Sequence, residues 1–245
     1  MKQNIYDNPS FFNGYQAMRD NQTGLHQFVE QPAILSLLPD VTGATALDLG
    51  CGAGGLCRKL IELGSACVVG VDISRNMLAL AQKDAPAGIE FRHMAMEDFT
   101  AQDNTFDLVV SSLALHYLAD LETLFRRIHG WLKTPGTFLF SMEHPAFTCA
   151  QGIHPDCIED ETGAPLYWPF DCYSDEGRRE SHWFVDGVVR YHHTLSTILN
   201  SLLRSSLQIS AVLEPVATPA HEQKQPPLKT ERRRPTLLVV KAVKL

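Results

Sequence analysis

The stretch that most constrains this chain is LDLGCGAGGL, residues 47–56, in which a short apolar run enters a turn containing four glycines. Glycine has no Cβ, so the backbone can turn sharply there and can come close to a ligand. The apolar run predicts a buried strand, and the residues from Gly55 onward predict a helix. A strand, a glycine loop and a helix in this order are typical of sites that bind adenosine-containing ligands.

Two registers of the loop predict two different ligands. Gly50, Gly52 and Gly55 fit the G-x-G-x-x-G pattern of dinucleotide-binding loops, whereas Gly50, Gly52 and Gly54 follow Asp48 in a D-x-G-x-G-x-G pattern. Asp72 lies 22 residues after Gly50, at the end of the next expected strand. A carboxylate there can accept hydrogen bonds from both hydroxyls of a ribose, which suits either register.

Asp48 and the position of the loop in the chain favour the second register. A carboxylate beside the loop would repel a pyrophosphate, which needs the N–H groups of a helix N-terminus without a nearby negative charge. The same carboxylate suits a ligand that carries an ammonium and a sulfonium. Residues 1–46 precede the loop and include an expected helix over 26–39, whereas the fingerprint of nicotinamide enzymes usually opens its domain. We therefore expect an adenosine-like but cationic ligand.

Strand-like and helix-like segments alternate from residue 44 to 142. Leu121, Leu124, Phe125 and Ile128 repeat at helical spacing, and Asp120 stands where the N-cap of that helix belongs. Ser74 is expected to cap the helix after Asp72 in the same way. The expected strands cover 44–49, 67–72, 89–93, 106–111 and 137–142, with a turn at 134–136 leading into the last of them. Strands separated by helices of this length predict βαβ units and a parallel sheet covered on both faces.

The segments after this block differ in character. Residues 143–190 are rich in proline, glycine and aromatic residues without clear periodicity, which indicates a lid or insertion rather than a second domain. Residues 194–206 are expected to be helical, and 207–216 and 235–244 to be strands. The polar piece between those strands, 218–234, is expected to be a solvated loop in preference to an RNA-binding tail.

Composition limits the classes of protein to consider. A formal net charge of −7 argues against a chain devoted to nucleic acid. The first twenty residues contain no apolar signal region, and no run of 18 apolar residues predicts a membrane span. The six cysteines form no C-x-x-C pair, so we expect reduced thiols, a cytoplasmic protein and no metal site. The zinc alternative would use Cys149, Cys157, Cys172 and either His144 or His154.

The motifs together resemble the class I S-adenosylmethionine-dependent methyltransferases. LDLGCGAGG is similar to their first motif, VVGVDIS to the second, FDLVVSSLALHYL to the segment around strand four, and LKTPGTFLF to the turn into strand five. The likeness extends to bacterial small-molecule enzymes of the methyltransferase-11 type. It implies an α/β fold with a seven-stranded, mostly parallel, doubly wound Rossmann-like sheet whose last strand is antiparallel, plus a lid insertion. It also implies one methyltransferase domain over 1–245, with a helical cap over 1–40 and the lid over 143–190.

The resemblance assigns residues to an S-adenosylmethionine site. Gly50, Gly52 and Gly54 would pass beneath the methionine part, Asp72 would bind the ribose, and Arg19 would pair with the cofactor carboxylate. Where the family usually has an acid that binds the adenine amine, this chain has Ala95, so Glu97 or a backbone carbonyl would take that role. The remaining residues expected to contact the cofactor are Tyr15, Asp48, Ile73, Met77, Met96 and Ser111.

Candidate catalytic residues follow strands four and five, where open α/β sheets place their ligands. They are His116, Glu143, His144 and, before the last helix, His192 or His193; a histidine can act as a base for an oxygen or nitrogen acceptor. Structural roles for each of them, such as helix capping or packing, stay open. Methyl transfer to a small-molecule acceptor is thus expected, by a monomer or homodimer without nucleic-acid or membrane partners. The alternatives are an NAD(P)-dependent oxidoreductase and a non-catalytic module that binds the cofactor.

Overall fold

A computed structural model describes residues 2–20, 24–151 and 157–245 of the chain. Residues 1, 21–23 and 152–156, which belong to the expected cap and lid segments, lie outside the described residues, and so does His154. The helices are η1 (Ile5–Asp7), α1 (Pro9–Asp20), η2 (His26–Glu30), α2 (Gln31–Leu37), α3 (Gly55–Glu62), α4 (Arg75–Gln82), η3 (Leu115–Tyr117), α5 (Leu121–Trp131), α6 (Pro145–Thr148), α7 (Leu195–Arg204), α8 (Pro219–Lys224) and η4 (Pro226–Arg232).

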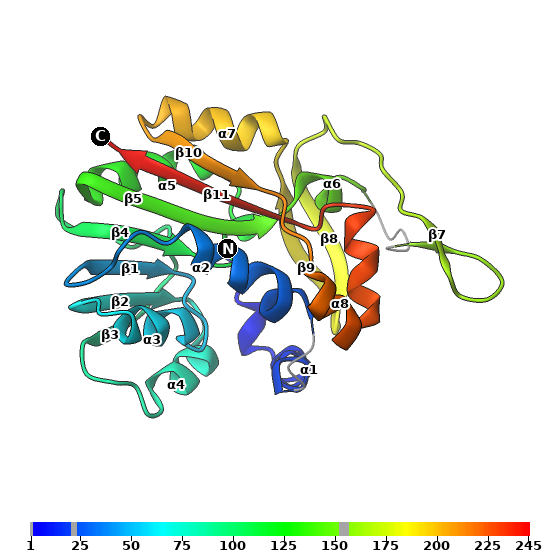
Figure 1. Cartoon of the computed structure of the whole chain (residues 1–245), viewed down its shortest axis with the longest axis horizontal. Coiled ribbons are helices and arrows are strands. Elements are labelled where there is room, and N and C mark those ends of the chain that lie inside the picture. The colour runs from blue at the N-terminus through cyan, green and yellow to red at the C-terminus, as the bar shows by residue number, and fades with distance from the viewer. Residues whose placement is uncertain (1, 21–23, 152–156) are drawn as a thin grey trace.

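A seven-stranded sheet forms the centre of the molecule, in the order β10-β11-β5-β4-β1-β2-β3 (Figure 1). Strands β1 to β5 run parallel, and β11, the last strand of the chain, is antiparallel to both of its neighbours. The strands are β1 (Thr45–Leu49), β2 (Cys67–Asp72), β3 (Ile89–His93), β4 (Phe106–Ser111), β5 (Leu132–Glu143), β10 (Gln208–Leu213) and β11 (Leu237–Lys244). This arrangement confirms the predicted fold class.

Helices cover both faces of the sheet. Because successive residues of a strand point to opposite faces, neighbouring residues of one strand are buried in different layers. Phe138 and Phe140 of β5 pack with α5 and α7 on one face, whereas Leu139 between them packs with α2, α3 and α4 on the other. The apolar stripe of α5 is buried as its spacing predicted, and the side chains of Ser74 and Asp120 cap α4 and α5.

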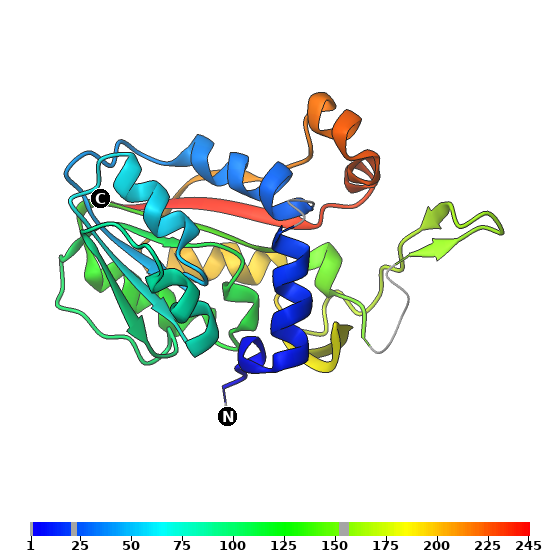
Figure 2. The same ribbon diagram turned by 90° about the horizontal axis from the view of Figure 1, so that it is seen from below.

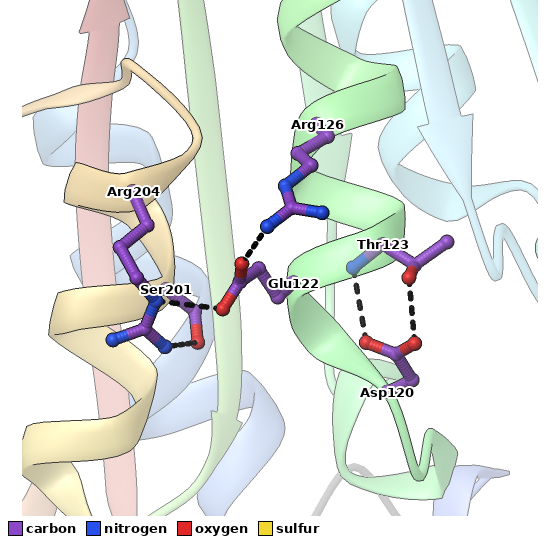
Figure 3. Close-up of polar contacts among 6 residues, drawn as sticks. All are labelled: Asp120, Glu122, Thr123, Arg126, Ser201 and Arg204. Atoms are coloured by element: carbon purple, nitrogen blue, oxygen red, sulfur yellow. Dashed lines mark hydrogen bonds and ion pairs between the residues drawn. The ribbon is translucent and has the colours of Figure 1, made fainter.

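Glu122 ties the two helices on the first face together. Its carboxylate pairs with Arg126 on its own helix and accepts a hydrogen bond of 2.7 Å from Nε of Arg204 on α7 (Figure 3). Arg204 also donates to the Ser201 hydroxyl at 3.1 Å, which holds the guanidinium along α7. The pair is partly exposed, so its contribution to stability is small.

Two local predictions were wrong. The turn expected over 134–136 is part of β5, which begins at Leu132. Phe106 of β4 pairs with Leu132, and Leu108 pairs with Thr137. The residues of β5 between these two pairs therefore bulge out of the ladder. The expected solvated loop over 218–234 instead contains α8 and η4, in which Arg232 pairs with Glu222. The buried Glu222 and Leu228 explain why this polar stretch is ordered.

The segment from 143 to 190 contains α6 and two hairpins. One hairpin, β6 (Ile158–Glu159) with β7 (Pro165–Tyr167), projects from the body of the molecule (Figure 2). The other, β8 (Gly177–Trp183) with β9 (Val185–His192), lies against the N-terminal helices, where Trp183 meets the ring of Phe11 edge to face at 5.1 Å.

Candidate functional site

One large cavity lies at the carboxyl ends of the parallel strands. Its volume is about 1420 Å³, and its wall is formed by the glycine loop, the residues that follow β2, β4 and β5, the N-terminal helices and the β8–β9 hairpin. Single small-molecule sites usually measure about 300–1,000 Å³. The cavity therefore has room for a cofactor and a second ligand.

The glycine loop approaches the cavity in a conformation that requires glycine. Gly50 has φ 79°, and a Cβ there would lie 2.4 Å from the Cβ of Ala114. Gly54 has φ 75° and precedes α3, and a Cβ there would lie 2.9 Å from the Phe91 ring. Gly50 and Gly52 line the cavity, whereas Gly54 does not and instead allows α3 to pack beside β3.

Asp72 is held rigidly at the end of β2. One carboxylate oxygen accepts the N–H of Gly52 at 2.8 Å, and the other accepts the N–H of Ser74 at 2.8 Å. Burial raises the pKa of this carboxyl although both hydrogen bonds oppose the rise. Asp72 lines the cavity, and each of its carboxylate oxygens can accept one more hydrogen bond. Two such acceptors suit the two hydroxyls of a ribose.

Asp48 lies at the floor of the cavity but is almost fully buried, with 1% of its surface exposed. One oxygen is 3.2 Å from the Cys57 thiol, which donates to it, and Oδ1 has no hydrogen-bond partner among the described residues. Burial raises its pKa to about 7, and the nearby carboxylates of Asp72 and Glu30 add to the rise. The expected negative charge is thus present on only part of the molecules at neutral pH. A buried acceptor without a donor fits the ammonium of S-adenosylmethionine.

Most of the other residues assigned to the cofactor also line the cavity; they are Tyr15, Arg19, Ile73, Met77, Met96 and Glu97. Ser111 does not, because its hydroxyl points into the sheet and donates to the carbonyl of Leu49 at 2.7 Å. The next residue, Ser112, lines the cavity instead. Successive side chains of a strand point to opposite faces, so a prediction that is wrong by one residue selects a side chain in the core instead of one in the site.

Of the candidate catalytic residues, His116 and Glu143 face the cavity. Nδ1 of His116 accepts the N–H of Glu143 at 3.4 Å, so the proton of the neutral ring resides on Nε2. Burial lowers the pKa of His116 to about 4, which keeps the ring neutral. His116 therefore presents a hydrogen-bond donor rather than a base.

Glu143 retains the features of a proton acceptor. Its Oε1 lies 3.1 Å from Nη1 of Arg190, and its Oε2 is buried without a hydrogen-bond partner among the described residues. Arg190 itself lies over the ring of Trp183 at 5.6 Å, which ties the carboxylate to the β8–β9 hairpin. A carboxylate with a free oxygen can receive a proton or bind a donor on a ligand.

His144, His192 and His193 are buried away from the cavity wall. His144 caps α6 and lies 2.8 Å from Glu214, while His192 contacts the Thr148 hydroxyl and the Tyr173 carbonyl. Nε2 of His193 contacts the Leu118 carbonyl at 2.8 Å. Each ring therefore stabilises a turn or a hairpin rather than lining the site.

Sequence reasoning missed several residues of the wall, above all Tyr6, Glu30 and Arg190. Tyr6 belongs to a short segment without periodicity, and Arg190 is the last residue of a stretch that indicated only a lid. Glu30 lies inside an expected helix between Val29 and Gln31, and nothing in the sequence distinguishes it from a solvent-facing residue.

Residues 2–7 form an N-terminal strap across the cavity. Gln3 exchanges hydrogen bonds with the backbone of β9, donating to Gly187 and accepting from Val189. Asp7 accepts from the Ser74 hydroxyl at 2.6 Å and from the N–H of Asn76 at 3.0 Å. The strap thus joins the cofactor side of the cavity to the hairpin.

The described residues contain no group of three or more metal-ligating side chains that could hold an ion. Within the same residues, no helix is long and apolar enough to cross a membrane.

Comparisons with known proteins identify a matching family model and several similar chains. A family model for a methyltransferase domain matches residues 47–140. The crystal structure of an S-adenosylmethionine-dependent methyltransferase from Mesorhizobium loti is 40% identical, with a TM-score of 0.82, and the match covers 90% of this chain and all of that one. An uncharacterized protein of Haemophilus influenzae is 35% identical over the whole of this chain and 98% of its own length.

A more distant relative has a named substrate. Phosphoethanolamine N-methyltransferase 3 of Arabidopsis thaliana is 35% identical over 121 residues, which are 48% of this chain but only 24% of that protein. The likeness is therefore with one part of a much longer enzyme.

Proposed function

The chain belongs to the class I S-adenosylmethionine-dependent methyltransferases, and from this premise we propose that it methylates an oxygen or nitrogen atom of a small-molecule acceptor. When bound, S-adenosylmethionine supplies a methyl group already activated by its sulfonium. The chain then has to hold the acceptor in line with that group, and such positioning alone can account for several kcal/mol of the barrier.

The observation that carries the proposal is the second group of polar side chains in the cavity. His116, Glu143 and Arg190 line the same cavity as the residues that suit the cofactor, and the Trp183 ring of the β8–β9 hairpin lies 5.6 Å from the Arg190 guanidinium. Nε2 of His116 would donate to an acceptor, and Oε2 of Glu143 would accept the proton that a hydroxyl or ammonium loses. The enclosure of this region by the hairpin and the strap suits a small molecule better than a polymer.

The proposed cofactor residues are those whose geometry fits the ligand. Asp72 would bind the ribose hydroxyls, Ile73 and Met96 would pack around the adenine, and Arg19 would pair with the carboxylate. Arg19 lies 5.9 Å from the centre of the Tyr15 ring, which would hold its guanidinium at the cavity wall. Gly50 and Gly52 would let the backbone pass close to the methionine part.

Binding of S-adenosylhomocysteine to wild type and to D72A tests the cofactor site. We expect titration calorimetry to show binding to the wild type and a loss of at least about tenfold in D72A, because two charge-assisted hydrogen bonds disappear. E62A removes an exposed carboxylate on α3 and should bind like the wild type. Equal affinities of D72A and wild type would refute the assignment of the ribose.

Transfer of a labelled methyl group tests the acceptor class. We expect wild-type protein, incubated with methyl-tritiated S-adenosylmethionine and a cell extract, to place the label in the low-mass fraction. D72A in the same extract measures the background. Label confined to the RNA or protein fraction would contradict a small-molecule acceptor.

A further inference from the structure

Glu30 is a buried carboxylate on the cavity wall that none of the expected roles uses. It ends the π-helical turn η2 and is 1% exposed. Its Oε1 accepts the hydroxyl of Ser112 at 2.8 Å and that of Ser141 at 2.5 Å. These two serines lie just beyond β4 and near the end of β5, so they fix the carboxylate at the carboxyl ends of the central strands. Single π-helical turns of this kind occur frequently at functional sites.

The second oxygen of Glu30 lacks a hydrogen bond of good geometry among the described residues. Oε2 lies 3.0 Å from Nδ1 of His26, but the atoms are not aligned as a hydrogen bond. The described hydrogen bonds and ion pairs give Glu30 no lysine or arginine partner. His26 supplies a counter-charge only while its ring is protonated, and burying a carboxylate without a permanent counter-charge is costly, so a cation supplied by a ligand would offset that cost.

Asp48 presents a second unpaired carboxylate oxygen close by. Asp48 on β1 is in register with Val110 on β4, two residues before the Ser112 that binds Glu30. With a rise of about 3.3 Å per residue, Ser112 lies about 7 Å further along the sheet than Asp48, so Glu30, which is bonded to Ser112, reaches the same end of the sheet. Each has one oxygen without a hydrogen-bond donor in the part of the chain that the structure describes, and both line the same cavity.

We propose that Glu30, together with Asp48, binds the α-ammonium of the methionine part of the cofactor. The inference rests on the proposed cofactor site, and it adds a residue from the N-terminal helical region to it. Arg19, from the preceding helix α1, would bind the carboxylate of the same amino-acid group. At the amino-acid end of the ligand, acidic side chains would thus bind the ammonium and a basic side chain would bind the carboxylate.

Three ligands separate recognition of the ammonium from recognition of the rest. S-adenosylhomocysteine carries both ionic groups, its deaminated analogue keeps only the carboxylate, and methylthioadenosine has neither. We expect the wild type to bind S-adenosylhomocysteine at least about tenfold more tightly than the deaminated analogue, as one charged hydrogen bond predicts. This comparison needs no variant and so does not depend on a mutant folding.

E30Q then tests whether Glu30 is the residue responsible. A glutamine oxygen can still accept both serine hydroxyls, and its amide can donate to His26, so thermal unfolding should show an intact fold. We expect E30Q to bind S-adenosylhomocysteine about tenfold more weakly, while its affinity for the deaminated analogue and for methylthioadenosine changes less than about threefold. E222Q, which neutralises a buried glutamate outside the cavity, should keep the full preference of the wild type.

The outcomes distinguish this inference from the cofactor assignment. If E30Q lost affinity for all three ligands equally, the role of Glu30 would be merely structural and the inference would be overturned. The same holds if E30Q kept the wild-type preference for S-adenosylhomocysteine over the deaminated analogue. If the wild type bound none of the three ligands, the cofactor site itself would be wrong. R19Q provides the reverse check, because it should weaken S-adenosylhomocysteine and the deaminated analogue alike.

Discussion

Replacing Asp48 with asparagine should make the ligand-free protein more stable at alkaline pH. The Asp48 side chain is 1% exposed, and burial raises its pKa from 3.8 to about 7. Between these two values the native state holds a proton that the unfolded chain has already released, so the free energy of unfolding falls as the pH rises. Each pH unit is worth about 1.36 kcal/mol, which amounts to about 4 kcal/mol at and above pH 7.

D48N removes this pH-dependent cost but adds a smaller constant one. The asparagine carbonyl can still accept a hydrogen bond from the Cys57 thiol, while its amide would occupy the position of Oδ1, which has no partner within residues 2–20, 24–151 and 157–245. A buried amide without an acceptor costs about 1–3 kcal/mol. D48N should therefore be about 1–3 kcal/mol more stable than the wild type at pH 8, and less stable by a similar amount near pH 4.

Urea unfolding of both proteins at several pH values between 4 and 8, without cofactor, measures the difference. D107N is the control, because Asp107 has a lowered pKa: its hydrogen bonds with Lys133 and Thr45 outweigh partial burial. Its carboxylate stabilises the native state above the unfolded pKa of 3.8, and this contribution is lost only below that value, so D107N should be less stable than the wild type by a nearly constant amount from pH 4 to 8. A wild-type stability curve that ran parallel to that of D48N would refute the burial argument. D48N should also bind S-adenosylhomocysteine more weakly, which would show that the acid is retained for binding.

Two further substitutions test the fold that carries the site. G54A should lower the free energy of unfolding in urea by about 2–3 kcal/mol, because a φ of 75° strains any side chain and the Cβ would lie 2.9 Å from the Phe91 ring. G43A, at φ 71° in open space, should lower it by only about 1 kcal/mol. Equal losses in the two variants would contradict the steric part of the argument. E122Q, which removes the bridge between α5 and α7, should lose no more than about 1 kcal/mol at low salt and almost nothing in 1 M NaCl; a loss that did not depend on salt would show that packing rather than charge holds the helices together.

The regular part of the fold was predictable because its signals are local. The strand before the glycine loop, the caps at Ser74 and Asp120 and the apolar stripe of α5 each depend on residues within a few positions of one another. The register of the loop was also local: Gly50 and Gly54 have positive φ, and the helix begins at Gly55. Short-range chemistry of this kind determines where an element begins and what ends it.

The orientation of single side chains was not local. Histidine at 116, 144 and 192 offered the same chemistry in the sequence, yet only His116 faces the cavity, because the other two are held by Glu214 and by Thr148 and Tyr173. The exchange of Ser111 for Ser112 has the same origin, since pairing with β1 turns the first hydroxyl into the sheet.

The sequence by itself determined that this chain builds an α/β sheet around a glycine loop suited to an adenosine-bearing methyl donor. Only the tertiary structure decided which acids meet at the cavity, and it brought Glu30 to the ends of β4 and β5, with β4 next to the strand that carries Asp48. The physical reason is distance along the chain. Hydrogen bonds between Glu30 and Ser112 or Ser141 span 82 and 111 residues, and such contacts arise only when packed elements bring remote segments together.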